Sequence, residues 1–175
     1  THRVVVYFIL SKPDSVDNFS MLQQEQQQHC DLIMTDLTES YKNLVYKVYA
    51  SFMFHQHYCP QTLFLMKVDD DVCIDIDRIL TDWNIEKNGS ISSIYCHKAY
   101  KGPAVRDPKH KLFVPKHIWP MPYFPTYCGG PAYIMGRSAE QAILDEARNF
   151  PPFYIEDVFY TGILAESIGI ERVDW

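Results

Sequence analysis

The stretch Thr62-Leu63-Phe64-Leu65-Met66-Lys67-Val68-Asp69-Asp70-Asp71 decides which fold we expect for this chain. Five of its first seven residues are apolar, and the run has the length of a strand. A near-continuous apolar run of this length predicts a strand over residues 62–68, buried on both faces of a parallel sheet. Ligands of open α/β sheets bind outside the carboxyl ends of the strands. The three aspartates that end the run are therefore expected at a ligand site.

These aspartates favour a divalent cation. In an extended backbone Asp69 and Asp71 point to the same side of the chain, with Asp70 opposite. Two converging carboxylates need a cation, and hard oxygen ligands suit Mg²⁺ or Mn²⁺, which usually also bind substrate phosphates. The residues alone are equally compatible with an ion that holds a diphosphate and with an acidic turn facing solvent. An EF-hand is disfavoured, because Cys73 stands where a third oxygen ligand should be and no glycine follows at the required place.

Composition limits the class of protein. The chain has 175 residues, is 47% hydrophobic and carries a formal net charge of −6. These values predict one domain with a real core, and the acidic balance argues against nucleic acid as a partner. No apolar stretch is long enough to span a membrane. We expect residues 1–175 to be a single domain and a fragment of a longer protein.

Alternating strand and helix patterns predict an α/β sandwich with a mostly parallel central sheet flanked by helices. Asp75 is expected to cap a helix that includes Trp83, and the pattern Ser138-x-x-Gln141 is a capping box that should start another helix. The predicted strands are 4–10, which should be buried, 31–34, 62–68, 92–96 and 132–135. The predicted helices are 18–29, 39–58, 75–83, 138–147 and one that follows 155–158 and stops near residue 169.

Residues 102–131 are predicted to form a proline-rich loop. Its rings at Trp119, Tyr123 and Tyr127 either provide platforms for sugar rings or bases, or pack onto the core. The pair Gly129-Gly130 permits left-handed backbone or close backbone approach to a ligand.

The cysteines and histidines show no metal pattern. Five cysteines without a CxxC pair make a zinc site unexpected, and their odd number leaves at least one thiol unpaired within the chain. His55 and His57 do not share a helix face and are interpreted as ordinary surface or core residues.

Three segments together resemble the β-1,3-galactosyltransferase family of inverting glycosyltransferases, which also contains β-1,3-N-acetylglucosaminyltransferases and the Fringe enzymes. The resemblance covers nearly the whole chain. The first segment is Asp36…Tyr41-Lys42-Asn43-Leu44…Lys47, similar to the family's D…Y-x-N-L-x-x-K helix, and the second is the metal motif Lys67–Val72. The third runs from Arg106-Asp107 through Val114-Pro115, residues 123–130 and Tyr133-Ile134-Met135 to Glu156-Asp157-Val158.

The resemblance implies a GT-A-type fold, Mn²⁺ or possibly Mg²⁺, and a type II Golgi membrane protein with a lumenal catalytic domain and an anchor outside this sequence. It implies transfer of galactose or N-acetylglucosamine from a UDP-sugar to a glycan hydroxyl, in β-1,3 linkage, on a glycoprotein or glycolipid. Gly129-Gly130-Pro131 replaces the family's Ser-Gly-Gly pattern, so the donor sugar is not assigned. Cys59 and Cys128 match cysteine positions of the family, and no disulfide is assigned.

The resemblance also assigns roles to residues. Asp157 is the expected base, where a plain helix cap is the alternative, and Glu156 is its neighbour. Asp71 is the expected main metal ligand, with Asp69 beside it. The expected donor-binding residues are Asp69, Asp70, Lys47, Asn43, Gly129 and Gly130, and the expected acceptor wall is Trp119, Tyr123 and Tyr127.

Some alternatives stay open at this point. Lys47 and Lys67 either support the phosphates and the acid cluster or form structural salt bridges. A rival function is a metal-dependent glycan-binding module without catalysis. A Mg²⁺-dependent phosphotransferase is disfavoured, because no GxxxxGK[ST] loop is present.

Overall fold

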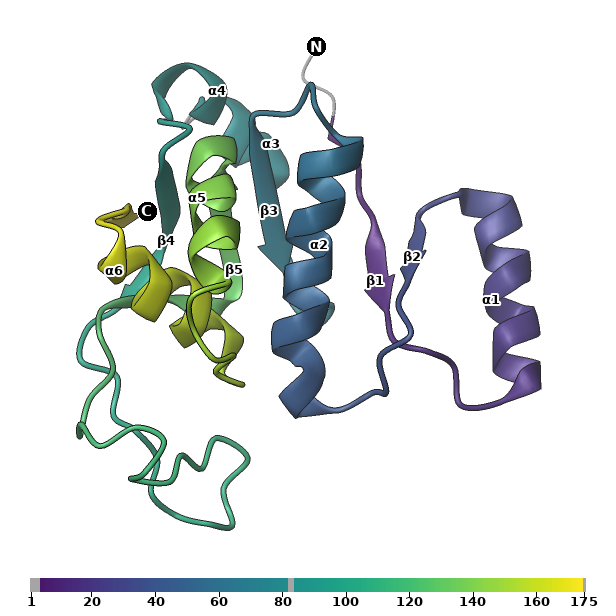
Figure 1. Ribbon diagram of the computed structural model, residues 1–175. Helices are drawn as coiled ribbons and strands as arrows, with labels where there is room; N and C mark the ends of the chain where they lie inside the picture. The colour runs from purple at the N-terminus through teal and green to yellow at the C-terminus, as the bar shows by residue number, and fades with distance from the viewer. Residues whose placement is uncertain (1–3, 82–83, 175) are drawn as a thin grey trace.

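The computed structural model describes residues 4–81 and 84–174, which form a mixed α/β fold (Figure 1). Within these residues, β1 (Phe8–Leu10) and β2 (Leu32–Met34) form a parallel pair beside α1 (Val16–His29). The main sheet has the order β3-β5-β4-β6, and its bounds are Phe64–Val68 for β3, Tyr127–Gly136 for β5, Ser93–Ala99 for β4 and Glu171–Asp174 for β6.

The expectation of a mostly parallel central sheet is wrong. The pairs β3/β5 and β4/β5 are antiparallel, and β4/β6 is parallel. An apolar run shows that a strand is buried but not which neighbours it pairs with, and here β5 inserts between β3 and β4. As a result β3 is an edge strand with half-buried side chains. The expectation of a buried strand over residues 4–10 is also wrong at its start, because residues 4–8 are about half exposed.

Helices cover both faces of the main sheet, as predicted. Along β5, Tyr133 and Met135 face the larger core, whereas Ile134 faces a second cluster on the opposite side. Helix α2 (Leu44–Tyr58) and helix α5 (Arg137–Ala147) pack against the first face. Near the second face are α3 (Ile76–Thr81) and α4 (Ile85–Asn88), and η1 (Tyr41–Asn43) precedes α2. In the described part of the chain, no helix has the length and apolar character that crossing a membrane requires.

Two expectations about helix ends have different outcomes. Asp75 does cap α3, because its side chain accepts from the backbone N–H of Arg78 at 3.0 Å. The capping box at Ser138 is wrong: α5 begins after Gly136 without a side-chain cap, and the N–H of Ser138 donates to the carbonyl of Ile91 at 2.9 Å. Trp83 lies outside the described residues.

The last predicted helix is partly a π-helix. Residues Val158–Leu164 form η2, and α6 (Ala165–Ser167) continues it. All but one residue of η2 are buried. Tyr160 packs on Phe52 of α2, and its hydroxyl donates to the carbonyl of Val45 at 2.7 Å. The widened π turn is rare in proteins and is frequent at functional sites.

Strand β5 is longer than predicted and includes residues 127–131, which were expected in the loop. It begins at Tyr127, so Gly129 and Gly130 lie within a strand. A disulfide joins Cys96 of β4 to Cys128 of β5, and Cys30, Cys59 and Cys73 are free thiols. The prediction of at least one unpaired thiol is confirmed.

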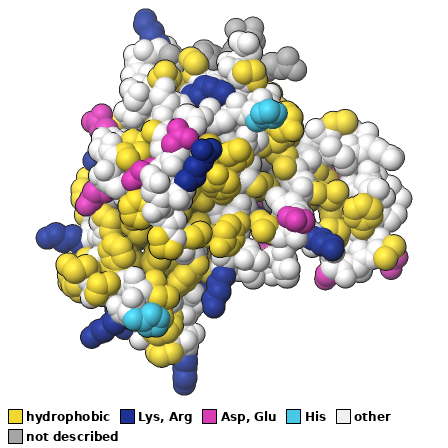
Figure 2. Space-filling view, in the orientation of Figure 1, with side chains coloured by type: hydrophobic (Ala, Val, Ile, Leu, Met, Phe, Trp, Pro, Cys, Tyr) yellow, Lys and Arg dark blue, Asp and Glu magenta, His cyan; other side chains and the backbone are white. Residues whose placement is uncertain are grey.

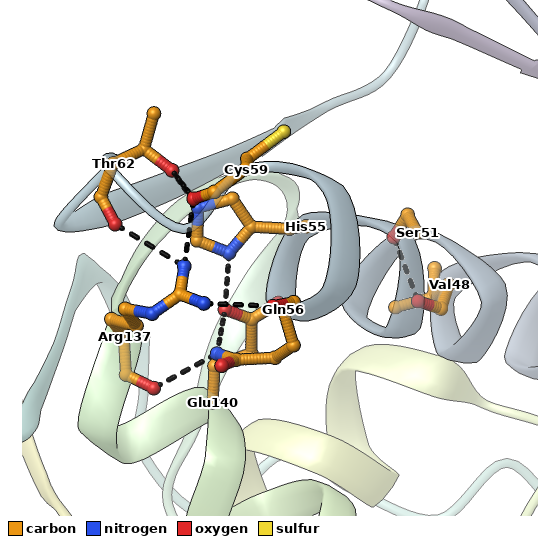
Figure 3. A network of polar contacts seen from close by, with 8 residues as sticks. All are labelled: Val48, Ser51, His55, Gln56, Cys59, Thr62, Arg137 and Glu140. Atoms are coloured by element: carbon orange, nitrogen blue, oxygen red, sulfur yellow. Dashed lines mark hydrogen bonds and ion pairs between the residues drawn. The ribbon is translucent and has the colours of Figure 1, made fainter.

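A buried polar network ties the end of α2 to the start of α5 (Figure 3). The Nδ1 atom of His55 lies 2.5 Å from Oε2 of Glu140, which also accepts from Gln56 at 2.7 Å. The guanidinium of Arg137 donates to the carbonyls of Gln56 at 2.8 Å and Cys59 at 2.9 Å, which satisfies carbonyls at the end of α2. Burial raises the pKa of Glu140, while its hydrogen bond with His55 lowers it. His55, expected to be an ordinary surface or core residue, is thus a buried structural histidine.

Replacing Glu140 with Ala should lower the free energy of unfolding by about 2–4 kcal/mol, because His55 and Gln56 both lose a buried hydrogen-bond partner and a cavity is left in their place. The matched control is Asp145→Ala, an exposed acid on the same helix, for which a change of about 0.5 kcal/mol or less is expected. Denaturant unfolding measures both. Equal effects of the two substitutions would contradict the structural role of the pair.

Candidate functional site

Lys67 lies at the centre of a cluster of carboxylates where β3, β5 and the start of η2 meet. Its Nζ donates to the carbonyl of Gly130 at 2.6 Å, pairs with the carboxylate of Asp69, and lies 3.1 Å from Oε1 of Glu156. Burial opposes the charge of Lys67, but Glu156 and Asp69 outweigh it and raise the pKa of Lys67. The cluster is therefore built around one buried ammonium group. Lys67 forms salt bridges inside the acid cluster, so the structure is compatible with both alternatives for this residue, and its support of a donor stays a prediction.

A bulge in β5 brings acids from two segments together. Between the pairs Cys96↔Tyr133 and Lys98↔Cys128, β5 runs several residues further than β4. A Cβ atom on residue 130 would lie only 3.0 Å from Oδ2 of Asp157. Any residue other than glycine at this position would therefore force the side chain of Asp157 to shift. Gly130 therefore allows the side chain of Asp157 to lie close to the backbone, whereas approach of a ligand to the glycine pair stays a prediction. Neither of the two glycines has a positive φ.

Glu156 and Asp157 stand at the start of η2 in different surroundings. Glu156 is 4% exposed, and the hydroxyl of Tyr133 donates to its Oε2 at 3.2 Å. Burial raises the pKa of Glu156 to about 7, with Lys67 opposing the shift and Asp157 adding to it. Burial also raises the pKa of Asp157, although the N–H of Val158, which donates to Oδ1 at 2.8 Å, lowers it. Both carboxyls hold a proton more tightly than usual.

The three aspartates after β3 form a turn, so the expectation that extended backbone points Asp69 and Asp71 to one side is wrong. The N–H of Asp69 donates to the carbonyl of Pro131 at 3.0 Å, and the N–H of Val72 then closes the turn on the carbonyl of Asp69 at 3.2 Å. Asp70 and Asp71 are exposed, and Asp69 is partly buried.

The donor atoms at this turn restrict the kind of metal site that fits. Among the described residues, no group of three or more His, Cys, Asp or Glu side chains is arranged to hold a metal ion. Mg²⁺-type ions commonly bind through one or two carboxylates and take their remaining ligands from water and substrate phosphates. The exposed carboxylates of the turn fit such a shared ion, and they do not fit a closed cage made by protein alone.

Two residues expected at the donor make local contacts instead. The side chain of Asn43 donates to the carbonyl of Thr38 at 2.8 Å, and Lys47 pairs with Glu39 at 2.9 Å. For Lys47, the structure shows the salt-bridge alternative. Their binding of a donor stays a prediction.

The three rings expected at the acceptor lie in different settings. Trp119 packs its ring on Phe124 and Phe153, with centroids 5.6 and 6.2 Å apart, so it lies partly buried against the core. Tyr123 is 53% exposed. Tyr127 is half-buried, and burial together with the charge of Asp157 raises its pKa. Of the three, Tyr127 is the ring that lies within electrostatic reach of the carboxylates.

Two tyrosines at the site were not predicted. Burial raises the pKa of Tyr41 to about 12, with the charges of Asp157, Glu156 and Asp69 adding to the shift. Tyr133 is fully buried and is the register partner of Lys67. A tyrosine at a helix start or inside a strand carries no sequence signal of a nearby acid, so contacts between distant segments were needed to find both.

Comparisons with known proteins agree with this architecture. A family model described as Galactosyltransferase matches residues 1–175. The chain is 28% identical over 195 residues to mouse beta-1,3-galactosyltransferase 4, covering 96% of this chain and 52% of that protein. It is 29% identical over 168 residues to human beta-1,3-galactosyltransferase 5, covering 96% and 54%. Rat lactosylceramide 1,3-N-acetyl-beta-D-glucosaminyltransferase is 28% identical over 177 residues, covering 98% and 47%. The chain thus spans about half the length of the curated relatives it matches.

The pKa of Glu156 should make stability depend on pH. The carboxyl has an ordinary pKa of 4.5 and a folded-state pKa of about 7, so its stabilising contribution is full below pH 4.5 and is lost as the pH rises to about 7. Glutamine resembles the protonated form and cannot ionise. The free energy of unfolding of Glu156→Gln, relative to wild type, should therefore increase by roughly 3 kcal/mol between pH 4.5 and pH 8.

Urea unfolding of both proteins across this pH range provides the test. Glu25→Gln is the matched control, because Glu25 is exposed on α1 and its replacement should leave the pH dependence unchanged. A wild-type to Glu156→Gln difference that stays constant with pH would show that Glu156 ionises in its ordinary range.

Proposed function

The chain belongs to the galactosyltransferase family, and we propose that it carries the catalytic site of an inverting β-1,3-hexosyltransferase. This site would move galactose or N-acetylglucosamine from a UDP-sugar to a glycan hydroxyl. The observation that carries the proposal is the meeting of Asp157, with its raised pKa, and the Lys67 cluster beside the exposed aspartate turn. One carboxylate for proton transfer and a separate acidic turn for a metal-bound diphosphate are what this reaction requires.

Asp157 is the proposed base. In an inverting transfer, the acceptor oxygen attacks the anomeric carbon while its proton passes to a base, and UDP departs from the opposite face. The Oδ1 atom of Asp157 accepts from the N–H of Val158, whereas Oδ2 lies against Gly130 in the bulge. The carboxylate also receives a backbone hydrogen bond from Gly130. A carboxylate oxygen has more than one lone pair, so Asp157 keeps the capacity to accept the proton. Burial raises the pKa of Asp157, which makes this carboxylate a better base than an exposed aspartate.

The proposed donor site lies at the turn that follows β3. Asp71 and Asp69 would hold Mn²⁺ or Mg²⁺, and an ion bound there would supply Lewis-acid stabilisation of the diphosphate leaving group. Lys67 holds the carboxylate of Asp69, and exposed Asp70 is available to the ribose or the sugar of the donor. A phosphate contact from Lys47 would require its pair with Glu39 to open.

The setting in the cell and the acceptor are also proposals. The family resemblance supports a GT-A-type fold and a Golgi membrane protein with a lumenal catalytic domain and a membrane anchor outside residues 1–175. The rat relative is named for lactosylceramide, a glycolipid, which supports a glycan acceptor on a lipid or a protein. A metal-dependent glycan-binding module without catalysis would bind sugar but would release no UDP with any acceptor.

Measurements of turnover test both the proposed hexosyl transfer and the role of Asp157 as the base. The full-length protein should release UDP from UDP-galactose or UDP-N-acetylglucosamine with at least one acceptor of a simple glycan panel. Asp157→Asn keeps the cap, because asparagine caps a helix as well as aspartate, but it cannot take a proton. Turnover should fall by at least about a hundredfold with the thermal midpoint and UDP binding close to wild type.

Asp145→Asn, an exposed aspartate of α5, serves as the matched control and should keep normal turnover. Near-normal turnover of Asp157→Asn would remove Asp157 as the base and make Glu156 the next candidate. No UDP release with any donor and acceptor would instead favour the glycan-binding module.

Calorimetric titration of UDP tests the metal site. Without metal, the acidic turn repels the diphosphate, and binding should be weak in wild type and in Asp71→Asn alike. With Mn²⁺, wild type should bind UDP more tightly, and Asp71→Asn should lose at least about tenfold in affinity. Asp77→Asn is the control, since Asp77 is an exposed aspartate of the following helix. Metal-independent binding of UDP by wild type would contradict the proposed site.

A further inference from the structure

Positive charge is concentrated in one segment of this acidic chain. Residues 97–117, called here the basic loop, hold six of the sixteen Lys and Arg residues and one of the 22 Asp and Glu residues. The segment thus carries a net charge of +5 in a chain of net charge −6. Its exposed cations are Lys101, Lys109, Lys111 and Lys116, and no carboxylate of the described residues forms an ion pair with any of them.

The basic loop has a fixed shape. The guanidinium of Arg106 donates to the carbonyls of Val114 at 2.7 Å and Trp119 at 2.8 Å, and also to that of Met121. Arg106 is therefore committed to the backbone of the loop rather than to a ligand. Hydrogen bonds from His110 to Asp107 and from Phe113 to His110 form successive turns, which carry Lys109 and Lys111. The lysines are thus presented to solvent on an ordered framework.

The basic loop lies next to the proposed active site. The hydroxyl of Tyr154, three residues before Asp157, donates to the carbonyl of Phe113. The Nζ of Lys111 lies 5.9 Å from the ring centroid of Tyr41, the tyrosine whose pKa is raised in part by the site carboxylates. In Figure 1 the connection between β4 and β5 projects beyond the end of the sheet, and Figure 2 shows cationic side chains spread over this end of the molecule.

We propose that the basic loop selects an acceptor saccharide that carries carboxylate or sulfate groups. This proposal rests on the proposed function and names the substrate class of the same site. The acids at the reaction centre repel an anionic acceptor, and the lysines of the loop supply the opposite charge on the side from which the acceptor comes. Charge-assisted hydrogen bonds from lysine to sulfate or carboxylate are about twice as strong as neutral ones. Tyr100 and Tyr123, 63% and 53% exposed, offer ring faces beside these cations.

An anionic membrane surface is the other partner that a basic loop could bind. A membrane surface attracts positive charge anywhere on a protein, whereas this loop is tied to the proposed site through Lys111, which lies over the ring of Tyr41, and through the hydrogen bond from Tyr154 to Phe113. The position of the basic loop near the proposed reaction centre favours a substrate that contacts both the loop and Asp157. A saccharide whose charged group lies a short distance from its reacting hydroxyl meets this condition.

Kinetics of the full-length protein with two matched acceptors test the proposal. The two share the reacting sugar, and one of them carries a sulfate or uronate on the neighbouring residue. At low salt, KM should be at least about tenfold lower for the anionic acceptor, and the advantage should shrink as salt screens the charges. In Lys109→Glu/Lys116→Glu the ratio of the two KM values should approach one. The control Lys12→Glu/Lys87→Glu makes the same change of charge at exposed lysines elsewhere and should keep the preference.

A binding measurement without UDP-sugar separates failure of this proposal from failure of the proposed function. Calorimetry should show binding of a heparin-derived hexasaccharide to wild type, and loss of this binding in Lys109→Glu/Lys116→Glu. Charge-dependent binding without turnover would uphold the loop site and reject the transferase. Turnover without any preference for the anionic acceptor would overturn the loop site. Sedimentation with phosphatidylcholine/phosphatidylserine vesicles, together with no binding of the hexasaccharide, would overturn it in favour of a membrane surface.

Discussion

The buried ammonium of Lys67 is the constraint on which the site depends. It joins the carboxylate of Asp69, the carbonyl of Gly130 and the carboxylate of Glu156, which come from three distant parts of the chain. A charge removed from water is tolerated only when it is paired and hydrogen-bonded, so these segments must meet with the right geometry or the fold loses stability. The same contacts bring both the aspartate turn and Asp157 close to Gly130.

Several contacts of the fold hold β5 and η2 in the positions that bring Lys67 and Asp157 together. The disulfide between Cys96 and Cys128 ties β5 to β4 directly before β5 bulges away. The N–H of Cys128 donates to the hydroxyl of Thr161 at 2.9 Å, which anchors η2 against the same strand. The buried pair of His55 and Glu140 connects α2 to α5, and both helices pack against η2. Strand β5, the disulfide and η2 therefore all contribute to fixing the position of Asp157.

Electrostatics divide the region into an acidic centre and a basic rim. At the centre, burial raises the pKa of both Glu156 and Asp157, and Lys67 compensates only part of the negative charge. At the rim, the basic loop is held by backbone contacts of Arg106, so its lysines remain free to meet a ligand. The diphosphate of the donor would meet the positive charge of the metal ion at the aspartate turn, and an anionic acceptor would meet the lysines of the basic loop.

The sequence by itself predicted most of the helices and strands, the candidate acids of the site and the family of the chain. Apolar spacing located α2, and the runs Asp69-Asp70-Asp71 and Glu156-Asp157 were recognised as the acids of the site. These are local patterns, which can be recognised without knowledge of contacts between distant segments. Only the tertiary structure decided that β5 pairs antiparallel between β3 and β4, that Trp119 packs against the core, and that Lys67 rather than Lys47 joins the acids. Strand order, burial and ion pairing depend on contacts between segments far apart in the chain, and no spacing within one segment encodes which distant partner it will meet.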